Sequence, residues 1–138
     1  MGQKVLIATT QDILCAGLKT IFRADPRVSE VAEVRCQEDL YVQLALDGDL
    51  DFLVVSQTMI SDMALLPERR FAVLAVKPDL ALMRLAYEHG ARGYFSKEIS
   101  AEMLRILLDP RQDGFLVDPF LGEWIVRCLF EKTVLKIT

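Results

Sequence analysis

The sequence has little of what a disulfide-linked or metal-binding protein needs. It has 3 cysteines, Cys15, Cys36 and Cys128, which are an odd number, widely spaced and without a CxxC pair, and this argues against a disulfide framework. We therefore expect a reduced, cytoplasmic protein with buried thiols. Its single histidine, His89, has no Cys or His neighbour at metal-ligand spacing, and its place before Gly90 favours a helix end. No metal and no cofactor are expected.

Long apolar runs and an excess of basic charge are also missing. No apolar run approaches the ~18 residues that a membrane span needs, so we expect no membrane insertion. The net charge of −4 and pI of about 5.0 make the chain on its own a poor nucleic-acid binder. What the sequence does have is 138 residues that are 52% hydrophobic, which is enough for one domain with a real core.

Short apolar segments alternate with amphipathic segments along most of the chain. The apolar segments, read as strands, are 4–9, 28–34, 52–56, 71–76 and 93–95. Helix starts are predicted at Asp12, Gln37, Pro78, Ser100 and the Asp118-Pro119 pair, the last helix running to about residue 131. This alternation predicts an α/β fold of the flavodoxin-like, doubly wound type, with a five-stranded parallel sheet in the order 2-1-3-4-5.

Two features modify that fold. Only residues 57–70 separate the third and fourth strands, which is close to the minimum for a parallel crossover, so the third helix must be short, irregular or missing. The helix after Asp118 is additional to the five-strand pattern. We divide the chain into a domain over residues 1–109 and a linker with a C-terminal helix over residues 110–138.

The carboxyl ends of parallel strands form the usual ligand site of such a fold. The residues expected there are Thr9, Thr10, Ser56, Ala75 and Lys97. Four of them are small and neutral, and they are poor acids, bases or metal ligands. Two acidic residues, Asp12 and Asp62, follow the first and third strands closely enough to reach this site. A role as helix cap explains Asp12 better than a role in the site, and solvation of a loop explains Asp62 better.

The segment "GARGYFSKEIS", residues 90–100, together with the strand pattern, resembles the receiver domain of bacterial response regulators of the NarL/LuxR type. The resemblance covers roughly residues 3–108 and implies a CheY-like fold. Receivers carry a phosphoacceptor aspartate at the end of the third strand. Two acidic residues after the first strand hold Mg²⁺, a Ser or Thr ends the fourth strand, and a Lys ends the fifth.

Only one of these residues is kept here. Thr9 and Thr10 stand where the resemblance places the acidic pair, Ser56 stands at the phosphoacceptor position, and Ala75 replaces the hydroxyl. Lys97 alone matches. Mg²⁺ prefers carboxylate ligands, and a serine hydroxyl without a base or metal is a poor nucleophile. We therefore expect a pseudo-receiver without Mg²⁺, aspartyl phosphorylation or enzymatic activity.

The C-terminal segment "DGFLVDPFLGEWIVRCLF" resembles the linker that precedes a helix-turn-helix domain in NarL/LuxR-type regulators, and "LKIT" resembles the start of that domain. The resemblance implies DNA binding only through a domain outside this chain, although a stand-alone protein is the other option. On the last helix, an apolar stripe is formed by Leu121, Trp124, Ile125, Cys128 and Leu129, with Phe120 and Phe130 off it. The stripe packs on the domain or forms a contact with a second copy or a protein partner, with Phe120, Trp124, Ile125 and Cys128 as candidate contact residues on this helix. The resemblance to receivers adds Tyr94 as a candidate, on the face of the fourth helix, fifth strand and fifth helix that often dimerises in that family.

Two functions remain open at this point. The first is a phosphorylation-independent signalling module of a two-component-type transcription regulator, which acts through dimerisation or a protein partner. The alternative is a small-molecule sensor that uses the emptied phosphorylation pocket. The sequence leaves open the upstream signal, the target genes, the oligomeric state and its interface, whether the chain is a fragment of a longer regulator, and whether the pocket binds a ligand.

Overall fold

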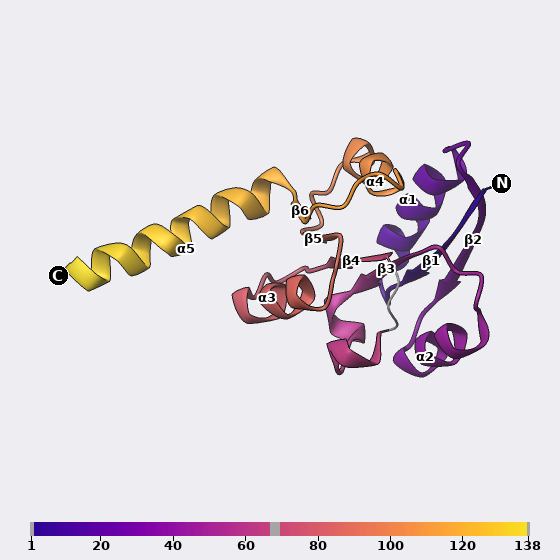
Figure 1. Ribbon diagram of the computed structural model, residues 1–138, viewed down its shortest axis with the longest axis horizontal. Coiled ribbons are helices and arrows are strands. Elements are labelled where there is room, and N and C mark those ends of the chain that lie inside the picture. The colour runs from indigo at the N-terminus through magenta and orange to yellow at the C-terminus, as the bar shows by residue number, and fades with distance from the viewer. Residues whose placement is uncertain (1, 67–69, 138) are drawn as a thin grey trace.

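The computed structural model describes residues 2–66 and 70–137, without the side chains of Leu65 and of residues 132–137. Its centre is a parallel sheet in the order β2-β1-β3-β4-β5-β6 (Figure 1). The strands are β1 (Gln3–Ala8), β2 (Val28–Val34), β3 (Phe52–Ser56), β4 (Arg70–Leu74), β5 (Gly93–Phe95) and β6 (Leu116–Val117). The helices are α1 (Asp12–Arg23), α2 (Gln37–Leu46), α3 (Leu80–Glu88), α4 (Ala101–Leu107) and α5 (Pro119–Ile137).

The strands bury both faces, which is why they read as continuous apolar runs. Alternate residues point to opposite faces. Leu6, Leu53 and Val55 pack with residues of α2 and α3, whereas Val5 and Val54 pack with residues of α1 and α4. The sheet is therefore covered on both sides, and the predicted doubly wound fold is confirmed.

The connection between β3 and β4 contains no α-helix in its described part. Two short 3-10 helices, η1 (Gln57–Met59) and η2 (Met63–Leu65), stand in its place, and Met59 and Met63 are buried against the sheet. The prediction of a short or irregular third crossover is confirmed. The side chain of Asp62 accepts a hydrogen bond from the backbone N–H of Ala64 (2.9 Å) and so caps η2.

The sheet has one strand more than the sequence pattern predicted. β6 is only two residues long and pairs in parallel with β5. Its backbone passes close to Gly93, where an added Cβ would lie 3.0 Å from the carbonyl oxygen of Leu116 and even closer to the ring of Phe95. A strand this short carries no detectable alternation, so the sequence could not predict it.

Two predicted helix starts were wrong by one or two residues. Asp12 is the first residue of α1 and its carboxylate pairs with Arg35, so it is not the cap. Pro78 precedes α3, whose cap is Asp79, and this carboxylate accepts from the N–H groups of Ala81 and Leu82. Ser100 caps α4 as predicted, since its hydroxyl accepts from the N–H of Met103 (3.2 Å). His89 is the C-cap of α3, and Gly90 follows it with a φ of 85°.

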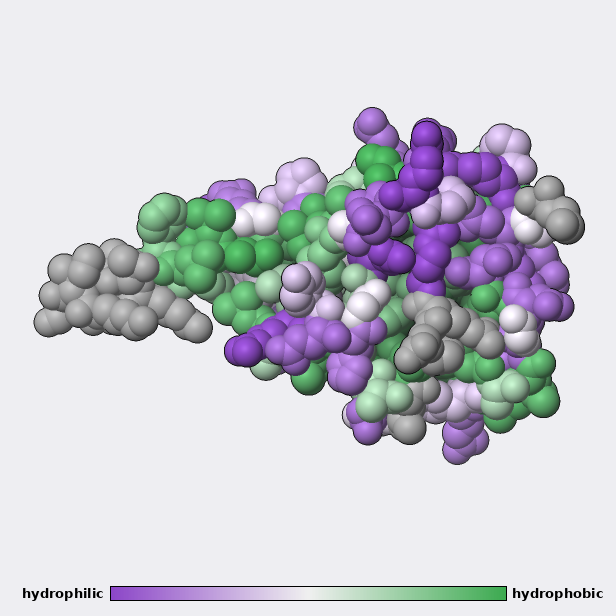
Figure 2. Space-filling view, in the orientation of Figure 1, coloured by the Kyte–Doolittle hydropathy of each residue, from purple (hydrophilic) through white to green (hydrophobic). Residues whose placement is uncertain are grey.

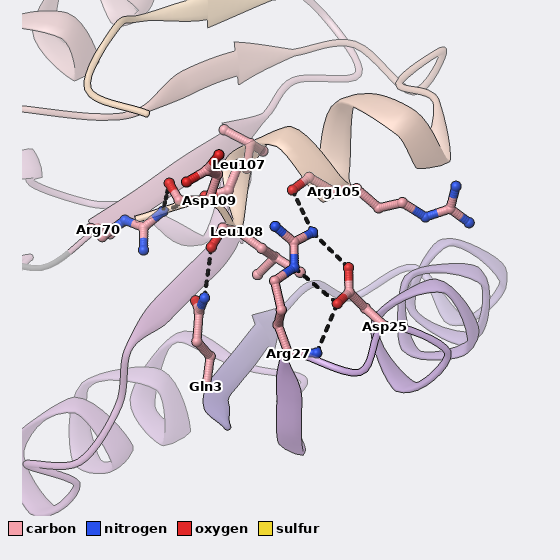
Figure 3. Close-up of polar contacts among 8 residues, drawn as sticks. All are labelled: Gln3, Asp25, Arg27, Arg70, Arg105, Leu107, Leu108 and Asp109. Atoms are coloured by element: carbon pink, nitrogen blue, oxygen red, sulfur yellow. Dashed lines mark hydrogen bonds and ion pairs between the residues drawn. The ribbon is translucent and has the colours of Figure 1, made fainter. Parts of the chain in front are cut away.

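The C-terminus of α4 is tied to the amino ends of three strands. Its last carbonyls have no partner within the helix, as at any helix end. Side chains at the starts of β1, β2 and β4, those of Gln3, Arg27 and Arg70, donate hydrogen bonds to these carbonyls (Figure 3). The acceptors are the backbone oxygens of Arg105, Leu107, Leu108 and Asp109. These contacts hold the C-terminal end of α4 at the amino ends of the strands, which is the end of the sheet opposite their carboxyl ends.

Candidate functional site

A cavity of about 360 Å³ lies at the carboxyl ends of β1, β3 and β4. It is lined by Thr10, Gln11, Ser56, Gln57, Thr58, Leu74, Val76 and Lys77. The lining contains hydroxyl groups, two amides, two apolar side chains and one ammonium group, and no carboxylate. The position agrees with the expectation that ligands bind outside the carboxyl ends of strands.

The structure brings only two of the five predicted site residues, Thr10 and Ser56, to this cavity. Thr9 is fully buried, and its hydroxyl accepts a hydrogen bond from the N–H of Gln11 (3.2 Å). Ala75 is also buried, and Lys97 is exposed without lining the cavity. The lysine that does line it is Lys77, which sequence reasoning missed because nothing in the sequence tells which lysine faces the site.

Ser56 is the last residue of β3, and its side chain is 9% exposed. It precedes η1 at the N-cap position, yet its hydroxyl caps no N–H group there. The small part of the side chain that remains exposed lies in the cavity wall. Ser56 therefore forms part of the cavity wall, and its hydroxyl is not used as a cap of η1.

Gln57 connects the cavity to the neighbouring elements. Its side-chain amide donates a hydrogen bond to the carbonyl oxygen of Lys77 (3.2 Å), and its amide oxygen accepts from the hydroxyl of Tyr94. The Tyr94 hydroxyl in turn accepts from the N–H of Asp79, the cap of α3 (3.1 Å). The end of β3, the loop after β4, and β5 are thus linked through two side chains.

Tyr94 is not the surface residue that we predicted. It is fully buried between the sheet and α3, and burial raises the pKa of its phenol. The resemblance to receivers placed this aromatic on an exposed face, but the amide of Gln57 provides an internal partner for the hydroxyl. No sequence signal joins two residues that lie 37 positions apart.

Asp118 anchors α5 to the sheet. Its carboxylate is fully buried and accepts from the N–H of Leu121 (2.9 Å), as expected of the predicted helix cap. It also accepts from the N–H (2.7 Å) and the hydroxyl (2.8 Å) of Ser96, which lies just after β5. This second role was not predicted, and it fixes where α5 begins.

Beyond its first turns, α5 projects away from the body of the domain (Figure 1). Of its apolar stripe, Leu121 is buried, Trp124, Ile125 and Cys128 are partly buried, and Leu129 is exposed. Phe120 is 54% exposed, as predicted for a residue off the stripe. The stripe thus packs on the domain only at its N-terminal end.

A second, mainly apolar cavity of about 390 Å³ lies between α3, β6 and α5. It is lined by Met83, Arg84, Tyr87, Phe115, Val117 and Ile125. Apolar side chains also gather on α5 where it leaves the domain (Figure 2). Val126 and Phe130, which lie one helical turn apart there, are 49% and 66% exposed.

Two further absences hold for the described residues. No three His, Cys, Asp or Glu side chains are grouped so that they could hold a metal ion. None of the helices is both long enough and apolar enough to span a bilayer.

No protein-family model and no curated protein sequence matches the chain. Solved structures do match it. A LuxR-family two-component response regulator from Aurantimonas sp. SI85-9A1 is similar with a TM-score of 0.71 and 17% identity, over 92% of this chain and 97% of that one. A LuxR-family DNA-binding response regulator from Silicibacter pomeroyi has a TM-score of 0.64 and 21% identity, over 83% of this chain and 96% of that one. A CheY-like receiver domain protein from Methanospirillum hungatei has a TM-score of 0.67 and 13% identity, over 79% of this chain and 95% of that one. The chain therefore has the fold of response-regulator receiver domains.

Proposed function

We propose that the chain is a receiver-like regulatory module that works without aspartyl phosphorylation and transmits its signal through a second copy of itself or a protein partner. The receiver fold of its structural neighbours supports the first half of this proposal. In this proposal the protein is cytoplasmic, has no enzymatic activity, and belongs to a two-component-type transcription regulator. Any contact with DNA is made by a domain outside this chain.

The observation that carries the proposal is the composition of the strand ends. A receiver needs carboxylates for Mg²⁺ and a carboxylate as phosphoacceptor, and the cavity here is lined by hydroxyl, amide, apolar and ammonium groups. The nearby Asp12 and Asp62 are engaged, the first by Arg35 and the second as the cap of η2. This donor set does not fit Mg²⁺.

Beryllofluoride with Mg²⁺, which mimics a phosphoryl group on aspartate, tests this part of the proposal. We expect the amide NMR spectrum of the chain to stay unchanged on addition of both reagents, because no acceptor carboxylate is present at Ser56. A receiver-fold protein that keeps its aspartates serves as the positive control. Saturable, Mg²⁺-dependent shifts at residues 56–58 would contradict the proposal.

The second half of the proposal concerns α5. A helix with apolar side chains on more than one face is normally covered on more than one side. One face, with Leu121 and Trp124, packs on the domain, whereas Val126 and Phe130 are largely exposed. Glu123 and Arg127 form an ion pair (2.7 Å) that makes up a polar strip on the same helix. We take the exposed face of α5 that carries Val126 and Phe130 as the contact surface.

Light scattering tests this contact. We expect the wild-type chain to have the mass of a dimer and the double variant Val126→Glu with Phe130→Glu to have the mass of a monomer. Leu46→Glu, which adds the same kind of charge at an exposed apolar residue of α2 (81% exposed), is the matched control and should stay dimeric. A wild-type monomer at all concentrations would exclude self-association and leave only a partner protein; a dimer that survives the double variant would place the contact elsewhere.

A further inference from the structure

We propose that the cavity at the strand ends binds a small organic acid with one carboxylate and a short apolar body. This goes beyond the regulatory role proposed above, and it names a ligand class for the sensor alternative that the sequence left open. It uses the same edge of the sheet that receivers use for phosphoryl transfer, but with a different cation and no metal.

The cation is Lys77. Its side chain is exposed at the cavity wall and forms no ion pair within the described residues. Its backbone is held in place, because the carbonyl oxygen accepts from the side-chain amide of Gln57 (3.2 Å). No acidic side chain lines the cavity, so the ammonium group has no charge partner of its own there. One uncompensated positive charge matches one negative charge on a ligand.

Two sets of hydrogen-bond donors stand beside this charge. The hydroxyl of Ser56 belongs to a side chain that is 9% exposed, lines the cavity and caps no helix. The N-terminus of α1 adjoins the cavity through Gln11, and no side chain caps this 12-residue helix. Free N–H groups at a helix N-terminus favour an anion. Ser56 and Gln11, the residue before α1, thus line the same cavity as Lys77, and the charge of Asp12 in the first turn of α1 is compensated by Arg35.

The remaining walls define the body of the ligand. Leu74 is buried below the cavity and Val76 is 51% exposed at its rim, so part of the lining is apolar. An amino acid is disfavoured, because its ammonium group would find no carboxylate there. A volume of about 360 Å³ lies at the lower end of the range for small-ligand sites. Short branched aliphatic or aromatic monocarboxylic acids fit these conditions.

Occupancy of the cavity has a structural route to the rest of the domain. Gln57 lines this cavity and also a smaller one of about 150 Å³ against α3, and its amide oxygen accepts from the Tyr94 hydroxyl. A ligand that contacts Gln57 acts on the side chain that positions Tyr94 and the start of α3. The amide signals of residues 79 and 94 therefore serve as a second readout.

The test is an NMR titration of the full chain with 3-methylbutanoate and with benzoate. We expect saturable shifts at residues 56–58 and 77, with a Kd in the low-millimolar range that suits ligands of this size. The uncharged amide of 3-methylbutanoate is the matched probe, and it should bind about tenfold more weakly or not at all because it lacks the charge. Inorganic phosphate is the third arm. Tighter binding of phosphate than of either carboxylate would overturn the proposed class in favour of a bare anion site.

Two variants locate the site. Lys77→Gln should weaken carboxylate binding about tenfold, which is what loss of one charge-assisted hydrogen bond causes. Lys97→Gln removes the exposed lysine that does not line the cavity, and it should leave the Kd unchanged. Both positions are exposed, so the fold should persist. Absence of saturable shifts with either carboxylate, or equal binding by Lys77→Gln, would refute the inference. The beryllofluoride and light-scattering outcomes are read separately, so failure here is distinct from failure of the proposed function.

Discussion

Replacement of Asp118 by alanine tests how α5 is joined to the domain. The carboxylate is fully buried and accepts three hydrogen bonds, two from Ser96 at 2.7 and 2.8 Å and one from the N–H of Leu121 at 2.9 Å. Alanine offers no acceptor. The N–H of Ser96 would then be buried without an acceptor, its hydroxyl would keep only the hydrogen bond that it accepts from the N–H of Glu98 (3.0 Å), and α5 would lose its cap.

The expected loss follows from these contacts. A helix cap contributes about 1 kcal/mol, and each hydrogen bond to a charged group about 1.5 kcal/mol or more. Asp118→Ala should therefore lower the free energy of unfolding by about 3 to 5 kcal/mol. Asp118→Asn keeps one acceptor oxygen, so we expect about half of that loss. Domains are typically stable by only about 5 to 15 kcal/mol, so the alanine variant will be close to unfolding.

Urea unfolding followed by circular dichroism measures these losses. The matched control is Ser100→Ala, which removes an exposed cap with a single hydrogen bond of 3.2 Å to the N–H of Met103. It should cost about 1 kcal/mol or less. If Asp118→Ala costs no more than Ser100→Ala, the buried contact with Ser96 does not hold α5, and the reasoning is refuted.

Three further predictions concern groups away from α5. Tyr94→Phe should lower the free energy of unfolding by about 1 to 3 kcal/mol in the same urea assay, because the amide oxygen of Gln57 loses its hydrogen-bond donor. An unchanged free energy of unfolding would contradict a stabilising hydrogen bond between Tyr94 and Gln57. Thiol reagents at pH 8, followed by mass spectrometry, should modify exposed Cys36 first and Cys15 last, because burial and a hydrogen bond to Glu33 raise the pKa of the Cys15 thiol to about 11. The hydrogen bonds from Arg27 lower the pKa of Asp25 in the folded protein. The ionised Asp25 therefore stabilises the fold fully above its unfolded pKa of about 3.9, and this stabilisation is lost as the pH falls through the lower pKa of the folded state. The difference in unfolding free energy between wild type and Asp25→Asn should therefore shrink in acid, and a constant difference would exclude this explanation.

The fold was largely predictable because its signals are local. Apolar runs, caps such as Ser100 and Asp118, and the short third connection can each be read within a few residues of sequence. Pro78 shows the limit of such signals, since a proline and a better cap, Asp79, stand side by side and only one begins the helix. β6 lacked a signal because two residues show no alternation.

The candidate site was less predictable because its side chains come from distant segments. The sequence placed neutral residues at the strand ends, yet it could not show that Thr9 is fully buried or that Lys77 lines the cavity in place of Lys97. Tyr94 was placed on the surface by the resemblance to receivers, and its internal partner, Gln57, cannot be recognised from spacing. The direction of a side chain depends on packing, which sequence patterns describe only on average.

The two candidate surfaces are joined through β5. This strand has only three residues, but Tyr94 within it accepts from the N–H of Asp79 at the start of α3, and Ser96 just after it donates to Asp118 at the start of α5. The apolar cavity between α3 and α5 is therefore bounded by two helices whose first residues are positioned from the same strand. Because Gln57 links Tyr94 to the cavity at the strand ends, that cavity has a continuous hydrogen-bonded connection to α3.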